Sequence, residues 1–190
     1  MQIKYTWMNA AYWLQQAAQA IQYLHDLKNT SYVHRDIKPQ NMLLKKDYRH
    51  LKLCDFGLSS EEMKKNIINS GGGSAHYMAP EIISGECTKK CDIYSWALCL
   101  SHCLSHQRPF RECRNSPAIK DYKSRNKGYF KLPESAFDQK NEEAAVEEFF
   151  KELIKNCTFE DPDERITIEY ITKSMDTLLE GHLIPDVTFS

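Results

Sequence analysis

One short stretch of the sequence holds a carboxylate, a cation and an amide close together. It reads His34-Arg35-Asp36-Ile37-Lys38-Pro39-Gln40-Asn41. Transfer of a phosphoryl group from ATP needs a carboxylate near the acceptor hydroxyl, a cation on the transferring phosphate and ligands for Mg²⁺. Asp36 can be the carboxylate, Lys38 the cation and Asn41 a metal ligand, because Mg²⁺ prefers oxygen donors. The stretch therefore predicts phosphoryl-transfer chemistry.

Two triplets follow this stretch along the chain. Asp55-Phe56-Gly57 supplies a second candidate Mg²⁺ ligand, Asp55, and an aromatic ring, Phe56, that is expected to pack underneath it. Ala79-Pro80-Glu81 closes the segment that begins at Asp55. Each triplet alone arises easily by chance, and an isolated aspartate is most often a solvated loop residue. Three motifs in a fixed order are a much stronger signal.

Short elements are predicted around these motifs. Apolar residues at helical spacing predict a helix over 9–27. Met42–Leu44 and Leu51–Cys54 have the pattern of two short strands around a polar turn. Residues 91–106 are apolar around most of the helix circumference, which predicts a buried central helix that Pro109 ends.

Weaker patterns predict further helices in the C-terminal third. They cover 117–126, 142–155 and 167–179, and Asp161-Pro162-Asp163-Glu164 has the residues of a helix start. No internal repeat or interdomain linker separates these patterns. We therefore expect 1–190 to form one mainly helical domain with a little β-structure.

Composition gives limits on partners and location. The chain has 190 residues and a formal net charge of −1, which gives no overall drive toward nucleic acid or an anionic membrane. No apolar run is long enough to cross a bilayer, and the N-terminus lacks a signal-like apolar stretch. We therefore expect no membrane insertion and a cytoplasmic location. The seven cysteines, none in a CxxC motif, are then expected to be free thiols.

Together, the motifs resemble those of the eukaryotic protein kinases, in the family's order and along nearly the whole chain. The resemblance implies the large, C-terminal lobe of a protein-kinase-like fold, mainly helical with short strands around the catalytic loop. It implies ATP and Mg²⁺ as cofactors. It places Lys38, Asn41, Leu43 and Asp55 at the nucleotide and its metal.

The same resemblance assigns structural roles. His34 and Phe56 are expected to support the site. Asp92 looks like the aspartate of the central helix that bonds the backbone of the catalytic loop. Arg165 looks like the arginine that pairs with Glu81 and ties the activation segment to the lobe; the alternative is a surface charge. Asp36 is expected on a solvent-facing loop.

Finer features are similar to the serine/threonine kinases. Lys38 stands two residues after Asp36, and Ser74 lies where such kinases carry Ser or Thr. Cys54 and the runs 73–81 and 90–96 look like the transforming-growth-factor-β-activated kinase branch of the MAP kinase kinase kinases. This implies a protein substrate, with a MAP kinase kinase as the candidate. Two residues depart from that group's usual Trp and Pro without touching the catalytic groups: Thr158 and Ile166.

The glycine-rich segment before the third motif is expected to regulate activity. The whole segment from Asp55 to Glu81 contains no threonine, so a phosphosite there must be one of its serines, Ser59, Ser60, Ser70 or Ser74. Ser70 is the better candidate, because Ser74 is expected to bond Asp36 and Lys38. Arg35 offers a cation for such a phosphate. A structural, hydrogen-bonding arginine is the alternative, and both can hold.

No glycine precedes Gly57. A kinase small lobe holds the ATP phosphates under a Gly-rich loop and pins them with a strand lysine paired to a helix glutamate. We therefore expect a large lobe without its small lobe. Two hypotheses stay open: a serine/threonine protein kinase, and a non-catalytic interaction module that competes with an intact relative.

Some cysteines also have two interpretations. Cys99, His102, Cys103 and His106 share one helical face and could meet a metal. Four ligands from one straight helix cannot enclose a tetrahedral ion, however, and a buried core helix explains them as well. Cys54 is either a modifiable thiol beside the nucleotide or an inert buried one.

The expected lack of the Gly-rich loop and strand lysine that hold the ATP phosphates leads to a kinetic prediction. The chain as given should phosphorylate protein substrates far more slowly than the same chain extended by a small lobe. Positioning and electrostatic stabilisation supply nearly all the catalysis in this reaction, so half a site should be a poor catalyst. Steady-state assays of the purified chain check this, and turnover in the usual kinase range of ~1–100 s⁻¹ would contradict it.

Overall fold

The computed structural model describes residues 3–27, 31–61, 74–83, 85, 87–125 and 144–190. Its helices are α1 (Trp7–His25), α2 (Pro80–Ile83), α3 (Lys89–Ser105), α4 (Ser116–Arg125), α5 (Ala144–Cys157) and α6 (Ile168–Leu179). The short 3₁₀ helices are η1 (Pro39–Asn41), η2 (Ser74–His76) and η5 (Pro162–Glu164). The strands are β1 (Ile3–Lys4), β2 (Tyr32–Val33), β3 (Met42–Leu44), β4 (Leu51–Leu53), β5 (Ser60–Glu61) and β6 (Thr188–Phe189).

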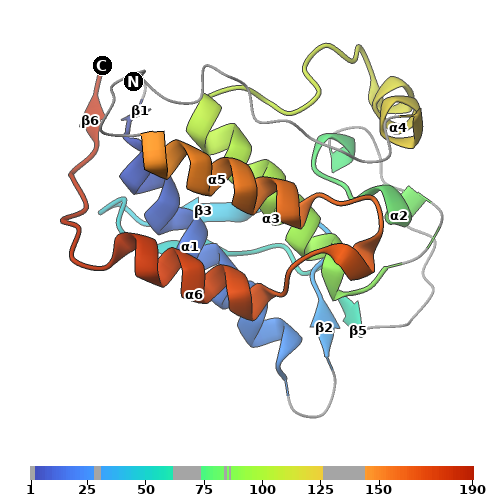
Figure 1. Cartoon of the computed structure of the whole chain (residues 1–190), viewed down its shortest axis with the longest axis horizontal. Helices are drawn as coiled ribbons and strands as arrows, with labels where there is room; N and C mark the ends of the chain where they lie inside the picture. The colour runs from blue at the N-terminus through green and yellow to red at the C-terminus, as the bar shows by residue number, and fades with distance from the viewer. Residues whose placement is uncertain (1–2, 28–30, 62–73, 84, 86, 126–143) are drawn as a thin grey trace.

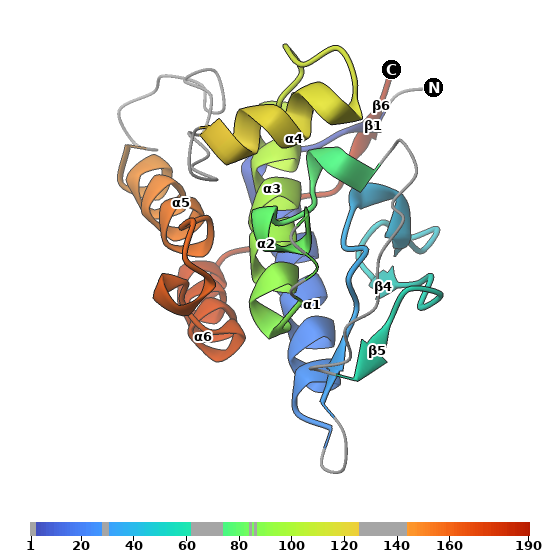
Figure 2. The same ribbon diagram turned by 90° about the vertical axis from the view of Figure 1, so that its right-hand side faces the viewer.

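Helix α3 is the centre of the core. The side chain of Thr88 caps its first turn by accepting from the backbone N–H of Lys90 at 3.3 Å. Apolar residues surround most of the helix, and nearly all of it is buried, as the sequence predicted. The Trp96 indole N–H donates to the carbonyl of Leu14 at 2.8 Å, which fastens α3 to α1. Figure 2 shows α1 and α3 as the middle layer of the molecule.

Helices α5 and α6 cover one side of that layer (Figure 1). Thr167 caps α6 by accepting from the backbone N–H of Tyr170 at 3.2 Å. Each helix turns one apolar face inward, with polar residues outside. The buried residues of α6 are Ile168, Ile171, Thr172, Met175 and Leu179.

The hairpin β3–β4 lies on the opposite side of the layer (Figure 2). Its strands are antiparallel, and Leu43 pairs with Lys52. Helix α1 holds the turn, because the Trp13 indole N–H donates to the carbonyl of Tyr48 at 2.7 Å. Gln16 accepts from the backbone N–H of Leu51 at 3.0 Å. The hairpin predicted from sequence is confirmed, and α1 sets its position.

Two strand pairs were not predicted. Strand β1 pairs with β6, and β2 pairs with β5, with two residues in each strand. A two-residue strand has no readable periodicity, and each pair joins segments distant in sequence. The β2–β5 pair matters for the site, because β2 directly precedes residues 34–41 and β5 follows Asp55-Phe56-Gly57.

The predicted helices are confirmed with shifted ends. Helix α1 begins at Trp7, where Thr6 and Asn9 form a capping box. Helix α3 ends before His106, whose left-handed backbone (φ 53°) stops it ahead of Pro109. The helix start at Asp161 is a 3₁₀ turn, η5, whose cap accepts from the Asp163 N–H at 2.9 Å. A mainly helical chain with short strands is confirmed.

A buried ion pair connects α2 to the segment before α6. The Arg165 guanidinium binds the Glu81 carboxylate through two parallel contacts of 2.6 and 2.8 Å. It also donates to the carbonyls of Phe159 at 2.8 Å and Lys90 at 3.0 Å. The Arg165 and Glu81 side chains are 0% and 8% exposed. Such a bidentate pair fixes geometry as well as charge, so Arg165 is not a surface cation.

None of the helices within the described ranges is long and apolar enough to span a membrane.

This ion pair gives a stability prediction. Arg165→Ala should lower the free energy of unfolding by ~3–5 kcal/mol, because it leaves a buried carboxylate uncompensated. Arg125 provides a matched control, since its pair with Asp121 is 76% and 56% exposed. Arg125→Ala should cost only about 0.5 kcal/mol. Urea unfolding of both variants beside wild type measures the difference, and equal midpoints would contradict it.

Candidate active site

One buried carboxylate holds the backbone of the catalytic loop, residues 34–41. Asp92 lies in the first turn of α3 and is fully buried. Its two oxygens accept from the backbone N–H groups of His34 and Arg35, each at 2.8 Å. Nε2 of His25, at the end of α1, lies 2.9 Å from Oδ2 and carries the shared proton, because a carboxylate only accepts. Three donors and the N-terminal end of a helix compensate this buried charge.

These contacts fix an uncommon backbone conformation. Arg35 has a φ of 69°, in the left-handed region that residues other than glycine seldom adopt. Its guanidinium is buried and donates to the carbonyl of Glu61 in β5 at 3.5 Å. Arg35 therefore connects the loop to β5, which is the structural alternative considered above.

The contact expected between Arg35 and a phosphosite falls outside the described residues. Ser70 lies outside the described residues. Ser74 begins η2, but its side chain also lies outside the described part, so the expected bridge to Asp36 and Lys38 stays a prediction. The phosphate-binding role of Arg35 stays a prediction with them.

The two candidate catalytic residues, Asp36 and Lys38, meet the candidate metal ligand Asn41 in one cluster. The Lys38 ammonium lies 2.6 Å from Asp36 Oδ2. The Asn41 amide N–H₂ donates to the same oxygen at 3.0 Å and to the Asp36 carbonyl at 2.8 Å. A carboxylate, a cation and an amide are thus in direct contact, which brings together the groups that phosphoryl transfer uses.

Asp36 is more buried than expected. The sequence suggested a solvent-facing loop, whereas this residue is only 7% exposed. The contacts with Lys38 and Asn41 turn its carboxylate inward, since Asn41 itself is 5% exposed. The expectation of an open loop position was therefore wrong.

The hairpin brings Asn41 and Asp55 to the same place. Asn41 directly precedes β3, and Met42 pairs with Leu53 at the end of β4. The backbone N–H of Cys54 then donates to the carbonyl of Asn41 at 2.9 Å. Asp55 follows immediately, so both candidate metal ligands lie at the open end of one hairpin.

The donors at this end fit Mg²⁺. Asp36 engages the amide nitrogen of Asn41, so the amide oxygen is the atom suited to bind a cation. Asp55 adds a carboxylate on an exposed turn, with a left-handed φ of 64°. Mg²⁺ is usually bound by one or two protein oxygens together with water and phosphate oxygens. The pair can therefore hold the metal that the resemblance implies.

Phe56 does not pack underneath Asp55. It is 50% exposed, and its ring lies 5.0 Å from that of buried His34. The Gly57 N–H lies 3.4 Å from Asp55 Oδ1, and a Cβ on Gly57 would come within 3.3 Å of that oxygen. This tight turn places Phe56 at the surface, where its ring contacts the ring of His34. His34 is structural, with Nε2 at 3.2 Å from the carbonyl of Cys54.

Leu43 faces outward from the hairpin. Its neighbours Met42 and Leu44 pack against the core, whereas Leu43 is 54% exposed. Its predicted place beside a nucleotide needs an exposed apolar side chain, and the role stays a prediction. Cys54 is half-buried with its sulfur 3.4 Å from the carbonyl of Asn41, which leaves both interpretations of this thiol open.

The zinc alternative on α3 finds no support. His102 Nδ1 lies 2.7 Å from the hydroxyl of Tyr77, and the His106 ring packs against Tyr5 at 4.7 Å. Burial raises the pKa of Cys99 and of Cys103, which keeps these thiols protonated. Across the described ranges, no three His, Cys, Asp or Glu side chains are grouped to bind a metal. Cys99 lies in the core and Cys103 packs against it, whereas His106 is exposed.

Sequence reasoning missed two buried residues that act on the site region, His25 and Lys123. His25 binds Asp92, yet its place at the end of a predicted helix carried no signal. Lys123, on α4, is 1% exposed and contacts the backbone before the third motif. A lysine on a polar, weakly periodic helix is usually solvated, so composition pointed the other way.

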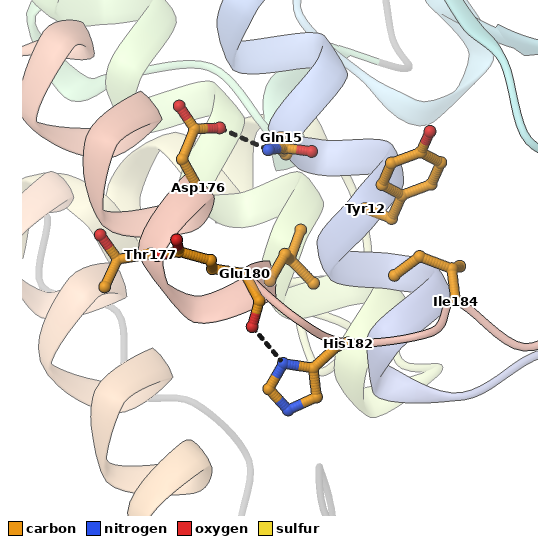
Figure 3. A pocket seen from close by; sticks show the side chains of 8 residues that line it. Tyr12, Gln15, Asp176, Thr177, Glu180, His182 and Ile184 are labelled. Atoms are coloured by element: carbon orange, nitrogen blue, oxygen red, sulfur yellow. Dashed lines mark hydrogen bonds between the residues drawn. The ribbon is translucent and has the colours of Figure 1, made fainter.

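A separate hollow of about 500 Å³ lies between α1 and α6 (Figure 3). Tyr12 and Gln15 line it from α1, and Asp176 and Glu180 line it from α6. Gln15 donates a hydrogen bond to Asp176 across it. No candidate catalytic residue lines this hollow, so it is not part of the candidate active site.

Residues 2–175 match the protein kinase domain family, and the chain belongs to that family. Mitogen-activated protein kinase kinase kinase 7 of Drosophila melanogaster is 32% identical over 181 residues, which cover 94% of this chain and 24% of the relative. The Homo sapiens protein of the same name is 33% identical over 176 residues, with 92% and 27% covered. Serine/threonine-protein kinase 12 of Arabidopsis thaliana is 32% identical over 170 residues, with 87% and 35% covered.

These comparisons confirm the resemblance inferred from the motifs, including the branch. The chain spans about a quarter to a third of the length of these three relatives. What those longer proteins do is therefore a separate question from the family of this domain.

Proposed function

We propose that this chain is the C-terminal lobe of a serine/threonine protein kinase that transfers the γ-phosphate of ATP to a protein hydroxyl. The observation that carries the proposal is the cluster of Asp36, Lys38 and Asn41, next to Asp55 at the open end of the hairpin. A module that only bound partners would have no chemical need for these contacts.

Each residue of the cluster has a distinct role in this proposal. Asp36 orients the acceptor hydroxyl and accepts its proton. Lys38, already beside that carboxylate, neutralises charge on the transferring phosphate. Asn41 and Asp55 bind Mg²⁺, which when bound offsets the charge of the phosphate oxygens. Asp92 keeps the loop backbone in the shape that places Asp36.

Similarity to mitogen-activated protein kinase kinase kinase 7 supports a place in a MAP kinase cascade. A MAP kinase kinase is then the proposed substrate, and the cytoplasm the proposed location. Arg35, Ser70 and Ser74 complete the proposal as its regulatory residues. The region after Ser74 would receive the substrate peptide.

The test separates chemistry from folding. In a full-length protein, which is this chain extended by a kinase small lobe, Asp36→Asn should lower kcat about 10²–10⁴-fold, because an amide cannot act as a base. The near-isosteric change should cost no more than about 2 kcal/mol of unfolding free energy, from the weakened contact with Lys38. Asp121→Asn is the matched control, since that carboxylate is 56% exposed on α4.

Peptide phosphorylation by the three proteins, with urea unfolding alongside, measures both effects. Wild-type turnover in Asp36→Asn would contradict the assignment of the base. A full-length wild-type protein that phosphorylates no protein or peptide hydroxyl would favour the non-catalytic interaction module instead.

A further inference from the structure

A buried lysine holds the backbone just before the third motif. Lys123 lies on α4, which sits beside η2 and α2 (Figures 1 and 2). Its ammonium donates to the carbonyls of Ala75 at 2.9 Å, His76 at 3.4 Å and Met78 at 2.6 Å. A buried charge is costly unless it is hydrogen-bonded, and these carbonyls take the place of water.

Two aromatic rings complete the surroundings of Lys123. Nζ lies 4.5 Å from the ring centroid of Phe110 and 5.4 Å from that of Tyr94. Aromatic faces favour a cation at these distances. An ammonium has three N–H donors for the three carbonyls, whereas a neutral amine has only two. The charged form therefore matches this site, and loss of the proton leaves one carbonyl without its donor.

The segment that Lys123 holds is anchored at its other end as well. Residues 75–78 directly precede Ala79-Pro80-Glu81, and Glu81 is fixed by Arg165. The ion pair thus sets where the segment ends, and Lys123 sets the path of its backbone.

We propose that Lys123 is a positioning residue for the protein substrate, holding residues 75–78 in the shape that receives the peptide next to the accepting hydroxyl. The inference rests on the proposed function, because it takes this segment as the peptide-binding one. Lys123 is 1% exposed and bonds backbone carbonyls, so it acts through the backbone that it holds.

The surroundings of Lys123 lower its pKa into a pH range in which folded proteins can be measured. Burial lowers the pKa of Lys123 from its ordinary 10.5 to about 7, while Glu81 and Cys113 act in the opposite direction. Burial also lowers the pKa of His76, which disfavours a second cation beside it. Burial raises the pKa of the Tyr94 hydroxyl, which stays neutral.

Two effects of pH follow with opposite signs. Peptide binding should weaken as pH rises through about 7, because the ammonium loses the proton that serves the third carbonyl. The contribution of Lys123 to the free energy of unfolding, measured as the difference between wild type and Lys123→Met, should instead rise between about pH 7 and pH 10, since the unfolded lysine then keeps a proton that the folded one has lost. Lys123→Met should abolish the pH dependence of peptide binding and remove this contribution to folding.

The direct test is independent of catalysis. Carbonyl ¹³C shifts of Ala75, His76 and Met78 are followed by NMR between about pH 6 and pH 8, the range of the shifted lysine. Wild type and the control Lys120→Met, on the same helix, should show a shared inflection at about pH 7. Lys123→Met should lack that inflection and keep only the His76 titration at lower pH.

The second readout is kinetic. In the full-length protein at pH 6.5 or below, Lys123→Met should raise KM for peptide about tenfold, the scale of a lost charge-assisted hydrogen bond, with KM for ATP unchanged. If Lys123→Met fails to fold, the wild-type carbonyl titration and the wild-type KM profile against pH still decide the question.

The outcomes are distinguishable. Carbonyl shifts of wild type without an inflection near pH 7 would overturn the role of Lys123, whatever the activity. An unchanged peptide KM in a folded, active Lys123→Met protein would overturn it too. A wild-type protein with the inflection but no phosphotransfer would overturn the proposed function and, with it, the assignment of the segment to substrate.

Discussion

The geometry of the catalytic loop depends on the hydrogen bonds that the carboxylate of Asp92 accepts. This carboxylate is fully buried at the start of α3, yet it bonds the end of α1 through His25 and the catalytic loop through His34 and Arg35. A buried charge is tolerated only when its partners are in place, so the carboxylate and the loop conformation stabilise each other. The left-handed backbone of Arg35 is the clearest sign of this constraint.

The rest of the site is built outward from this anchor. The loop carries Asp36 and Lys38 to the start of the hairpin, and the hairpin places Asp55 beside Asn41. A second anchor, the Arg165–Glu81 pair, fixes the end of the segment that Lys123 also contacts. The phosphate-facing and peptide-facing parts of the proposed site are therefore both held by buried charges that reach from helices to backbone.

Much of this could be predicted from the sequence, because the governing interactions are local. The hairpin follows from two short strand patterns, Met42–Leu44 and Leu51–Leu53, around a polar turn, and Asp36, Lys38 and Asn41 meet because the first and the last are only five positions apart. The inward turn of Asp36 and the exposure of Phe56 depend on local side-chain and turn geometry that residue types alone do not fix, whereas the role of His25 depends on its contact with Asp92 in a distant segment. The pairing of β1 with β6 also joins distant segments, and Lys123 contradicts the usual solvation of lysine.

Amide hydrogen exchange in Asp92→Asn tests the central claim most directly. The substitution keeps the shape but removes the charge, and it turns an amide N–H₂ toward a backbone donor. Exchange at His34 and Arg35 should accelerate about tenfold or more relative to wild type, the scale of a hydrogen bond to a charged group. Exchange at Leu53, within the hairpin, should change far less. Equal acceleration at all three sites, or none at His34 and Arg35, would contradict the claim that Asp92 holds the catalytic loop.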